Sequence, residues 1–154
     1  MKKIILLPVL LLFTSVFALN TSAVKLSKSD FIIYSTKDGK EVKPAEILSG
    51  MDSASVLFFG EEHNDSIGHA LQMIIFEELY KAFGSNATLS MEMFDRDVQH
   101  IMNEYLSGLI KKSYFLKDAK VWSNYKDYAP MVEFAKEKGL AVICANAPFR
   151  YVSV

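Results

Sequence analysis

Two patterns of apolar and polar positions alternate along the chain. Continuous apolar runs occur at Val56–Phe59 and Leu140–Ala145, and such runs are typical of strands that are buried on both faces of a parallel sheet. Between them, Thr88–Phe94 alternates apolar and polar side chains with the period of two that a strand requires. The pattern therefore predicts three strands.

Helical periodicity fills the intervals between these strands. Apolar residues recur every three or four positions in Ile67–Phe83 and in Val98–Leu106, which predicts two amphipathic helices. Gly84 is suited to end the first of them. A third helix is expected to start at Pro130 and to end at Gly139.

The order of these elements predicts the fold class and the position of a site. Strand, helix, strand, helices, strand is the order of an α/β fold with a parallel-sheet core and crossover helices. Ligands in such folds bind beyond the carboxyl ends of the strands. That rule selects three segments, Gly60–His63, Glu92–Phe94 and Asn146–Pro148.

The start of the chain has the features of an export signal. Two lysines precede the apolar run Ile4–Phe13, and Val16 and Ala18 fit the −3 and −1 positions of a signal-peptidase site. Residues 1–18 are therefore predicted to be a cleaved signal peptide, and the protein to be exported to the periplasm or to lie against a membrane. A membrane anchor is the alternative, but the run is short for a span of about 20 residues.

Composition excludes several classes of protein. A chain of 154 residues with 51% hydrophobic and 23% charged side chains is not generally disordered. A formal net charge of −1 gives no broad electrostatic footprint for nucleic acid. Cys144 is the single cysteine, which excludes an internal disulfide and a cysteine-cluster zinc site.

The segment after the first predicted strand contains the first candidate functional residues. Glu61 and His63 follow Gly60, and His69 lies close enough to the helix start to point to the same side. His63 could ligate a metal, act as a base or hydrogen-bond an anionic ligand. The alternative is a solvated loop with ordinary surface charges.

Glu92 and two tyrosines are further candidates. Glu92 lies near the end of an otherwise apolar strand, where a buried carboxylate costs several kcal/mol without a partner; His63 or a cation could be that partner. Tyr125 and Tyr128 precede Pro130, and a tyrosine phenolate can ligate haem iron. The alternative for each ring is packing against the sheet or at an interface.

Four segments, in the same order, resemble one known family. They are Phe58–His63 with His69 and Gln72, similar to the family's "LGExH…H..Q" signature; Met91–Asp97, similar to "MEMFQRD"; Trp122, Tyr128 and Pro130, similar to "W…Y.P"; and Ala145–Pro148, similar to an "NAP" strand end. The family is that of the ChaN-like haem-binding, iron-regulated lipoproteins. It belongs to a superfamily with the Tiki metalloproteases and the erythromycin-esterase-like proteins.

The resemblance implies an α/β domain that binds haem between two protomers of a homodimer. It implies tyrosine as the iron ligand with histidine assisting, and an association with an outer-membrane haem or iron transport system. Carried over by motif, Glu61, His63, His69 and Glu92 line the pocket. Tyr128 is the first choice for the iron ligand and Tyr125 the second.

The sequence departs from the family pattern in two respects. No lipobox cysteine follows the export signal, so the lipid anchor typical of the family has no attachment site. The family domain also continues beyond the "NAP" strand, so residues 19–154 are expected to be the N-terminal part of a truncated haem-binding domain.

Two other functions remain as hypotheses. A metal-dependent hydrolase of the Tiki type would hold a divalent ion with His63 and with Glu61 or Glu92, and the ion would lower the pKa of a bound water. The spacing matches no recognised motif such as H-E-x-x-H, which makes an enzyme the less favoured hypothesis. A non-functional truncated remnant is the other.

Overall fold

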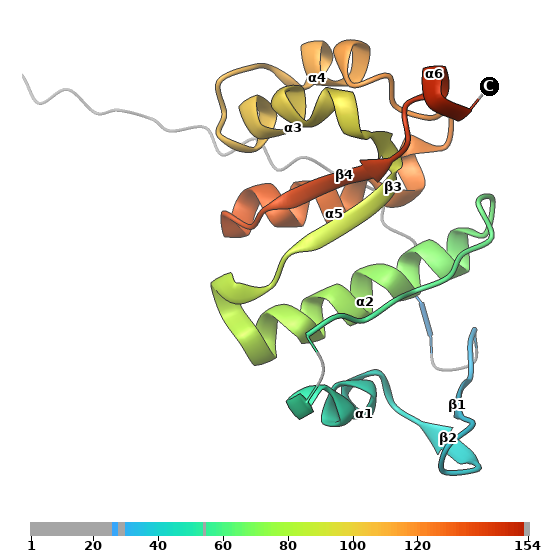
Figure 1. The fold of residues 1–154 in the computed structure, drawn as a ribbon. Coiled ribbons are helices and arrows are strands. Elements are labelled where there is room, and N and C mark those ends of the chain that lie inside the picture. Colours follow the sequence, from blue (N-terminus) through green and yellow to red (C-terminus); the bar gives the residue numbers. More distant parts are fainter. Residues whose placement is uncertain (1–25, 28–29, 54, 153–154) are drawn as a thin grey trace, which may run out of the picture.

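Two parallel strands lie at the centre of the fold. The computed structural model describes residues 26–27, 30–53 and 55–152, so the predicted signal peptide lies outside the described residues. Strands β3 (Leu89–Asp95) and β4 (Val142–Asn146) pair in parallel. The helices between them in the chain are α3 (Gln99–Leu106), α4 (Lys112–Asp118) and α5 (Tyr125–Lys138). Figure 1 shows α3 and α4 on one side of the strands and α2 on the other. The predicted α/β class is confirmed.

Helix α2 (Ser66–Phe83) follows the predicted boundaries closely. The Asp65 side chain accepts a hydrogen bond from the Ile67 backbone nitrogen at 2.9 Å, which satisfies one of the free N–H groups of the first turn. Gly84 ends the helix with a φ of 57°, a conformation that glycine adopts without strain. The apolar spacing and Gly84 were therefore sufficient to place both ends of the helix to within one residue.

The pairing of β3 with β4 is interrupted near their carboxyl ends. Met91 lies opposite Cys144, but the next pair is Asp95 with Asn146, so β3 carries extra residues in a bulge. The predicted alternation holds up to Met93, after which Phe94 is also buried. A bulge turns the strand locally, and here it allows two consecutive side chains to face the core.

The edge of β4 that faces away from β3 is covered by a side chain of α3. The Gln99 amide accepts a hydrogen bond from the Cys144 backbone nitrogen and donates one to the Val142 carbonyl, both at 2.8 Å. These are the two kinds of bond that a neighbouring strand would make. Gln99 therefore satisfies backbone groups that would otherwise be open for pairing with another chain.

The core lies between the sheet and the helices. Its rings are in contact: Tyr105 stacks on Phe115 with centroids 4.3 Å apart, and Phe94 meets Tyr128 edge-on at 5.9 Å. Cys144 is also buried, and burial raises the pKa of its thiol to about 11, so it is not a reactive cysteine. The largest fully buried side chains are His69, Phe94, Met102, Phe115, Tyr128, Val132, Val142 and Cys144.

The prediction of a buried strand at Val56–Phe59 is wrong for this structure. The segment belongs to no strand, and Val56 and Phe58 are 63% and 89% exposed. Leu57, Phe58 and Phe59 instead line an apolar groove beside α2. An apolar run indicates a preference for burial but does not supply a partner strand, and among the described residues β3 pairs only with β4.

Helix α5 begins at Tyr125, five residues before the predicted start at Pro130. Tyr125, Tyr128, Ala129 and Val132 are all buried and recur every three or four positions, so the helical stripe extends back through the two tyrosines. Proline lacks a backbone N–H, which removes one intrahelical bond. Burial of the tyrosine rings outweighs that loss.

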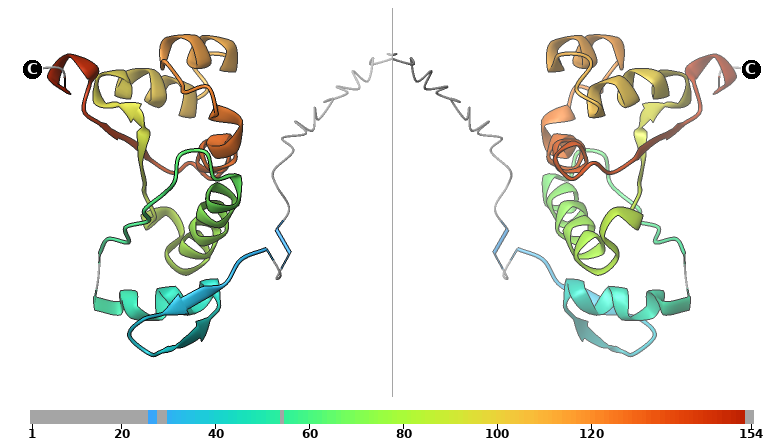
Figure 2. Two further views of the ribbon diagram at one scale, coloured as in Figure 1. Left: turned by 90° about the vertical axis from the view of Figure 1, so that its right-hand side faces the viewer. Right: turned by 90° about the vertical axis from the view of Figure 1, so that its left-hand side faces the viewer.

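Short elements complete the described structure. Strands β1 (Ile33–Ser35) and β2 (Lys40–Val42) form an antiparallel hairpin, which is followed by α1 (Pro44–Ile47). Turns of 3₁₀ helix occur at Leu48–Ser53, Gly84–Asn86 and Arg96–Val98. Helix α6 (Phe149–Val152) lies at the opposite end of the molecule from the hairpin (Figure 2). In the described part of the chain, no helix has both the length and the apolar character that a membrane span requires.

Candidate functional site

Glu61 and His63 form a pair in the loop that precedes α2. Oε1 of Glu61 lies 2.9 Å from Nδ1 of His63. The Glu61 side chain is 10% exposed, whereas the His63 side chain is 57% exposed. Because a carboxylate only accepts, Nδ1 carries the hydrogen, and in the neutral ring Nε2 keeps its lone pair. The pair therefore presents an oriented imidazole at the surface.

His69 and Gln72, one turn apart on α2, support this pair from inside. The Gln72 amide nitrogen donates to Oε2 of Glu61 at 2.9 Å, and its amide oxygen lies 2.9 Å from Nδ1 of His69. Nε2 of His69 lies 3.0 Å from the backbone carbonyl of His63. Each ring nitrogen of His69 therefore faces an oxygen acceptor. Oε2 of Glu61 lies 3.6 Å from Nδ1 of His69.

Two residues near the start of α5 complete the surroundings of His63. The Asn124 amide donates to the His63 carbonyl at 2.7 Å, and the Trp122 ring meets the His63 ring edge-on with centroids 5.1 Å apart. Asn124 and Gln72 were not among the predicted site residues. Gln72 stood in the "H..Q" segment, whereas nothing in the sequence pattern distinguishes Asn124, which is 61 positions from His63.

The two candidate tyrosines lie in the interior. The Tyr128 hydroxyl accepts a hydrogen bond from the Trp122 backbone N–H at 3.1 Å, and its ring centroid is 6.1 Å from that of His69. Burial raises the pKa of Tyr128 to about 12. Burial, reinforced by Glu133, also raises the pKa of Tyr125. The Tyr125 hydroxyl has no hydrogen-bond partner within the described structure. Both phenols are therefore held in the protonated form.

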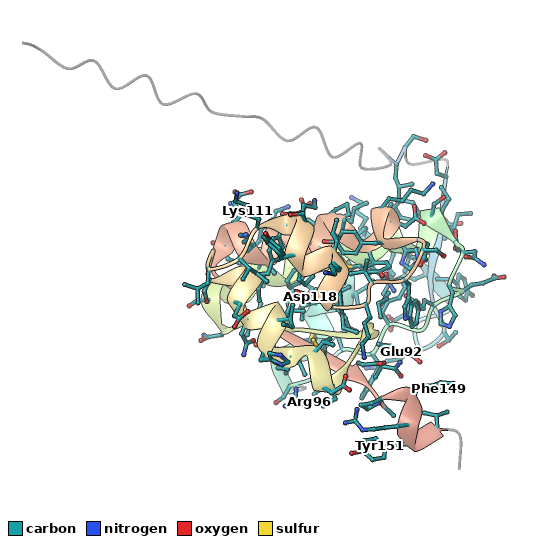
Figure 3. All side chains as sticks on the ribbon, turned by 90° about the horizontal axis from the view of Figure 1, so that it is seen from above. Glu92, Arg96, Lys111, Asp118, Phe149 and Tyr151 are labelled. Atoms are coloured by element: carbon teal, nitrogen blue, oxygen red, sulfur yellow. The ribbon has the colours of Figure 1, made fainter. Side chains whose placement is uncertain are left out.

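Glu92 does not join the other candidate residues. It lies on the exposed face of β3 and forms no hydrogen bond or ion pair with His63. Figure 3 shows it towards the edge of the molecule where Phe149 and Tyr151 extend from α6. The argument for a partner rested on burial of its carboxylate, and an exposed carboxylate needs none.

The third predicted segment, Asn146–Pro148, contributes mainly to structure. The Asn146 amide donates to Oδ1 of Asp95 at 3.0 Å and so ties together the ends of β4 and β3. Beside it, Arg150 of α6 pairs with Asp97. These side chains fix the carboxyl ends of the strands.

The metal ligands of the hydrolase hypothesis are not assembled in the described residues. No three histidine, cysteine, aspartate or glutamate side chains among them are placed to hold a metal ion. Both ring nitrogens of His69 are engaged in hydrogen bonds. What the site presents is one exposed imidazole, His63, beside one indole ring, Trp122.

Comparison with known proteins identifies the family of the chain. A family model described as "Haem-binding uptake, Tiki superfamily, ChaN" matches residues 47–154. That range is more than half of the chain and contains Glu61, His63, His69, Tyr125 and Tyr128. No curated protein and no solved structure matches. The chain therefore belongs to the ChaN family of haem-binding uptake proteins in the Tiki superfamily.

Proposed function

We propose that this chain is an exported haem-binding protein of haem or iron uptake, and that it binds haem against His63 and Trp122. The observation that supports this site is the Glu61–His63 pair. Histidines that ligate metals characteristically donate their second ring N–H to a carboxylate or a carbonyl, and histidine is a common axial ligand of haem iron. An exposed Nε2 with Nδ1 bonded to a carboxylate therefore fits haem.

The residues of the site have separate roles in this proposal. His63 would hold the iron through Nε2, and the Trp122 ring would provide an aromatic surface beside it. Haem, when bound, supplies the iron that the uptake system carries. Ligation of iron by Tyr128, or by Tyr125 as second choice, stays a prediction. For Tyr128 it requires the hydrogen bond to Trp122 to open and the phenol to leave the core.

The exposure of His63 supports a homodimer as the haem-bound form. The His63 side chain is 57% exposed, so a haem held by His63 and Trp122 would be incompletely covered by one protomer, and exposed apolar surface favours association. We propose a second copy of this chain as the cover, with an outer-membrane haem or iron transporter as the later partner. Sedimentation velocity with and without hemin tests this, because only the hemin-loaded protein should sediment as a dimer.

Export rests on the sequence of the first eighteen residues. Cleavage after Ala18 would leave Leu19 as the new N-terminus. The test is the intact mass of the protein recovered from the periplasm of a Gram-negative bacterial host. Recovery of only the full-length chain from the cytoplasm would refute export without bearing on haem binding.

Hemin titration of the purified full chain tests the haem site. We expect a Soret band to develop with saturation in the native protein and to weaken markedly in His63→Ala. His100→Ala is the matched control, because His100 is an exposed histidine on α3 away from the site. Equal titration curves for the native protein and His63→Ala would remove His63 from the proposal, and the absence of any band would refute haem binding.

A further inference from the structure

We propose that Gln72 is a positioning residue for His63 and acts through Glu61. The hydrogen bonds of the Gln72 amide in the described structure are to Glu61 and His69, and none is to the His63 ring. It bonds the carboxylate that in turn bonds Nδ1 of His63. The inference deepens the proposed haem site, on which it rests, and assigns a role to a residue that contacts no ligand.

The first step concerns the rigidity of the two segments. Glu61 and His63 lie in a loop without regular structure, whereas Gln72 lies in the second turn of the long helix α2. A loop carboxylate with no partner would rotate among several rotamers. The 2.9 Å hydrogen bond from the Gln72 amide links Oε2 of Glu61 to the helix. The helix thereby restricts the Glu61 side chain to one orientation.

The second step concerns the orientation of the Gln72 amide. Gln72 can hydrogen-bond Glu61 only through its amide nitrogen, because the carboxylate has no hydrogen to donate. Its amide oxygen is then directed at Nδ1 of His69, which is 99% buried and cannot turn to solvent. The orientation of the Gln72 amide is therefore fixed by Glu61 on one side and His69 on the other. Because the amide bonds Oε2 of Glu61, Oε1 is the oxygen that accepts from His63.

The third step concerns the ring nitrogen of His63 that forms no hydrogen bond within the described part of the chain. The backbone carbonyl of His63 is held by His69 and Asn124, and its Nδ1 by Glu61. Only Nε2 of the ring is without a partner in the described residues. A ring held at the backbone and at one nitrogen presents the other nitrogen in one tautomer and one direction, which lowers the entropic cost of binding.

The experiment separates this role from haem binding by using a readout without haem. Long-range ¹H–¹⁵N correlation of the histidine rings in the full chain distinguishes the protonated from the unprotonated ring nitrogen. We expect His63 to be protonated at Nδ1 in the native protein and to become a mixture of tautomers in Gln72→Met. Hemin affinity should fall about tenfold or more, as for other residues that orient metal ligands.

An exchange of partners provides the rescue. Gln72→Glu alone sets two carboxylates against each other and should give the same defect. Combined with Glu61→Gln, it restores the pattern: the introduced amide donates to the introduced carboxylate, and its oxygen accepts from Nδ1 of His63. The double variant should regain the single tautomer, so that the two changes are strongly non-additive. Glu62→Gln removes an exposed neighbouring carboxylate and should have no effect.

The outcomes are distinct. Native tautomer populations and native hemin affinity in Gln72→Met would overturn the proposal. So would a double variant that is no better than the sum of its single changes. Circular dichroism melting identifies a variant that fails to fold, in which case the double variant decides. A change of tautomer without any hemin binding in the native protein would refute the haem site but retain the positioning role.

Discussion

The hydroxyl of Tyr128 lies 3.1 Å from the backbone nitrogen of Trp122 and accepts its hydrogen bond. Tyr128 belongs to the core, whereas the Trp122 ring lies against the exposed ring of His63. One bond therefore joins the interior of α5 to the aromatic wall of the proposed haem site. The position of that wall depends on core packing.

The first prediction concerns this bond. Tyr128→Phe keeps the ring but leaves the partly buried Trp122 N–H without an acceptor, so we expect the free energy of unfolding to fall by about 1–3 kcal/mol. Urea unfolding followed by circular dichroism measures the loss. Tyr114→Phe is the control, because Tyr114 is 58% exposed and should tolerate the change. Equal stabilities of the two variants would contradict the prediction.

The same variant tests iron ligation. Ligation by Tyr128, as the family resemblance implies, requires the Soret band of the hemin complex to shift in Tyr128→Phe and to stay unchanged in Tyr125→Phe. A shift in Tyr125→Phe alone would assign the role to the second choice. Unchanged bands in both variants leave His63 as the protein ligand.

Stability should decline at alkaline pH. Burial raises the pKa of Tyr105, Tyr125 and Tyr128, that of Tyr128 to about 12, from about 10 in the unfolded chain. Above about pH 10 the unfolded chain releases these protons while the folded chain keeps them. The unfolded state then binds fewer protons, so the free energy of unfolding falls as pH rises.

Urea unfolding from about pH 8 to about pH 11, with phenolate absorbance recorded in parallel, measures this dependence. Stability should be level below about pH 10 and should fall above it, with a shallower fall in Tyr128→Phe. A constant free energy of unfolding up to about pH 11 would show that the phenols titrate equally in both states.

Gln99 should protect the chain against association. Gln99→Ala leaves the Cys144 N–H and the Val142 carbonyl without their side-chain partners, and we expect a loss of about 1–3 kcal/mol in stability. The exposed edge of β4 should also favour pairing between chains. Light scattering at increasing protein concentration measures that effect. His100→Ala, an exposed neighbour on the same helix, should remain monodisperse, and identical scattering of both variants would refute the role of Gln99.

Two glycines should respond differently to substitution. Gly139 ends α5 with a φ of 66°, whereas Gly60 has no positive φ, and an added Cβ would meet no atom at either position. Gly139→Ala should therefore cost about 1 kcal/mol through backbone strain alone. Gly60→Ala should be neutral. Thermal unfolding compares the two variants, and equal melting temperatures would contradict this assignment of strain.

Local signals in the sequence determined much of the fold. The apolar stripe of α2 and Gly84 at its end placed that helix, and alternation placed β3 with Met91 and Met93 inward. The position of His69 near a helix start also indicated that its ring could point to the same side as His63, and its Nε2 lies 3.0 Å from the His63 carbonyl. These features depend on neighbours within a few residues, which is the range over which sequence patterns act.

Contacts between distant segments decided the rest. Val56–Phe59 had the composition of a buried strand, but a strand also needs a partner along its edge, and the structure gives it none. Glu92 was expected in the site and is exposed, because the direction of a strand side chain depends on which face of the sheet is covered. Asn124 belongs to the site but was not predicted, because a local sequence pattern cannot indicate a hydrogen bond between residues 61 positions apart. Burial, pairing and long-range hydrogen bonds belong to the packed chain, so only the tertiary structure could decide them.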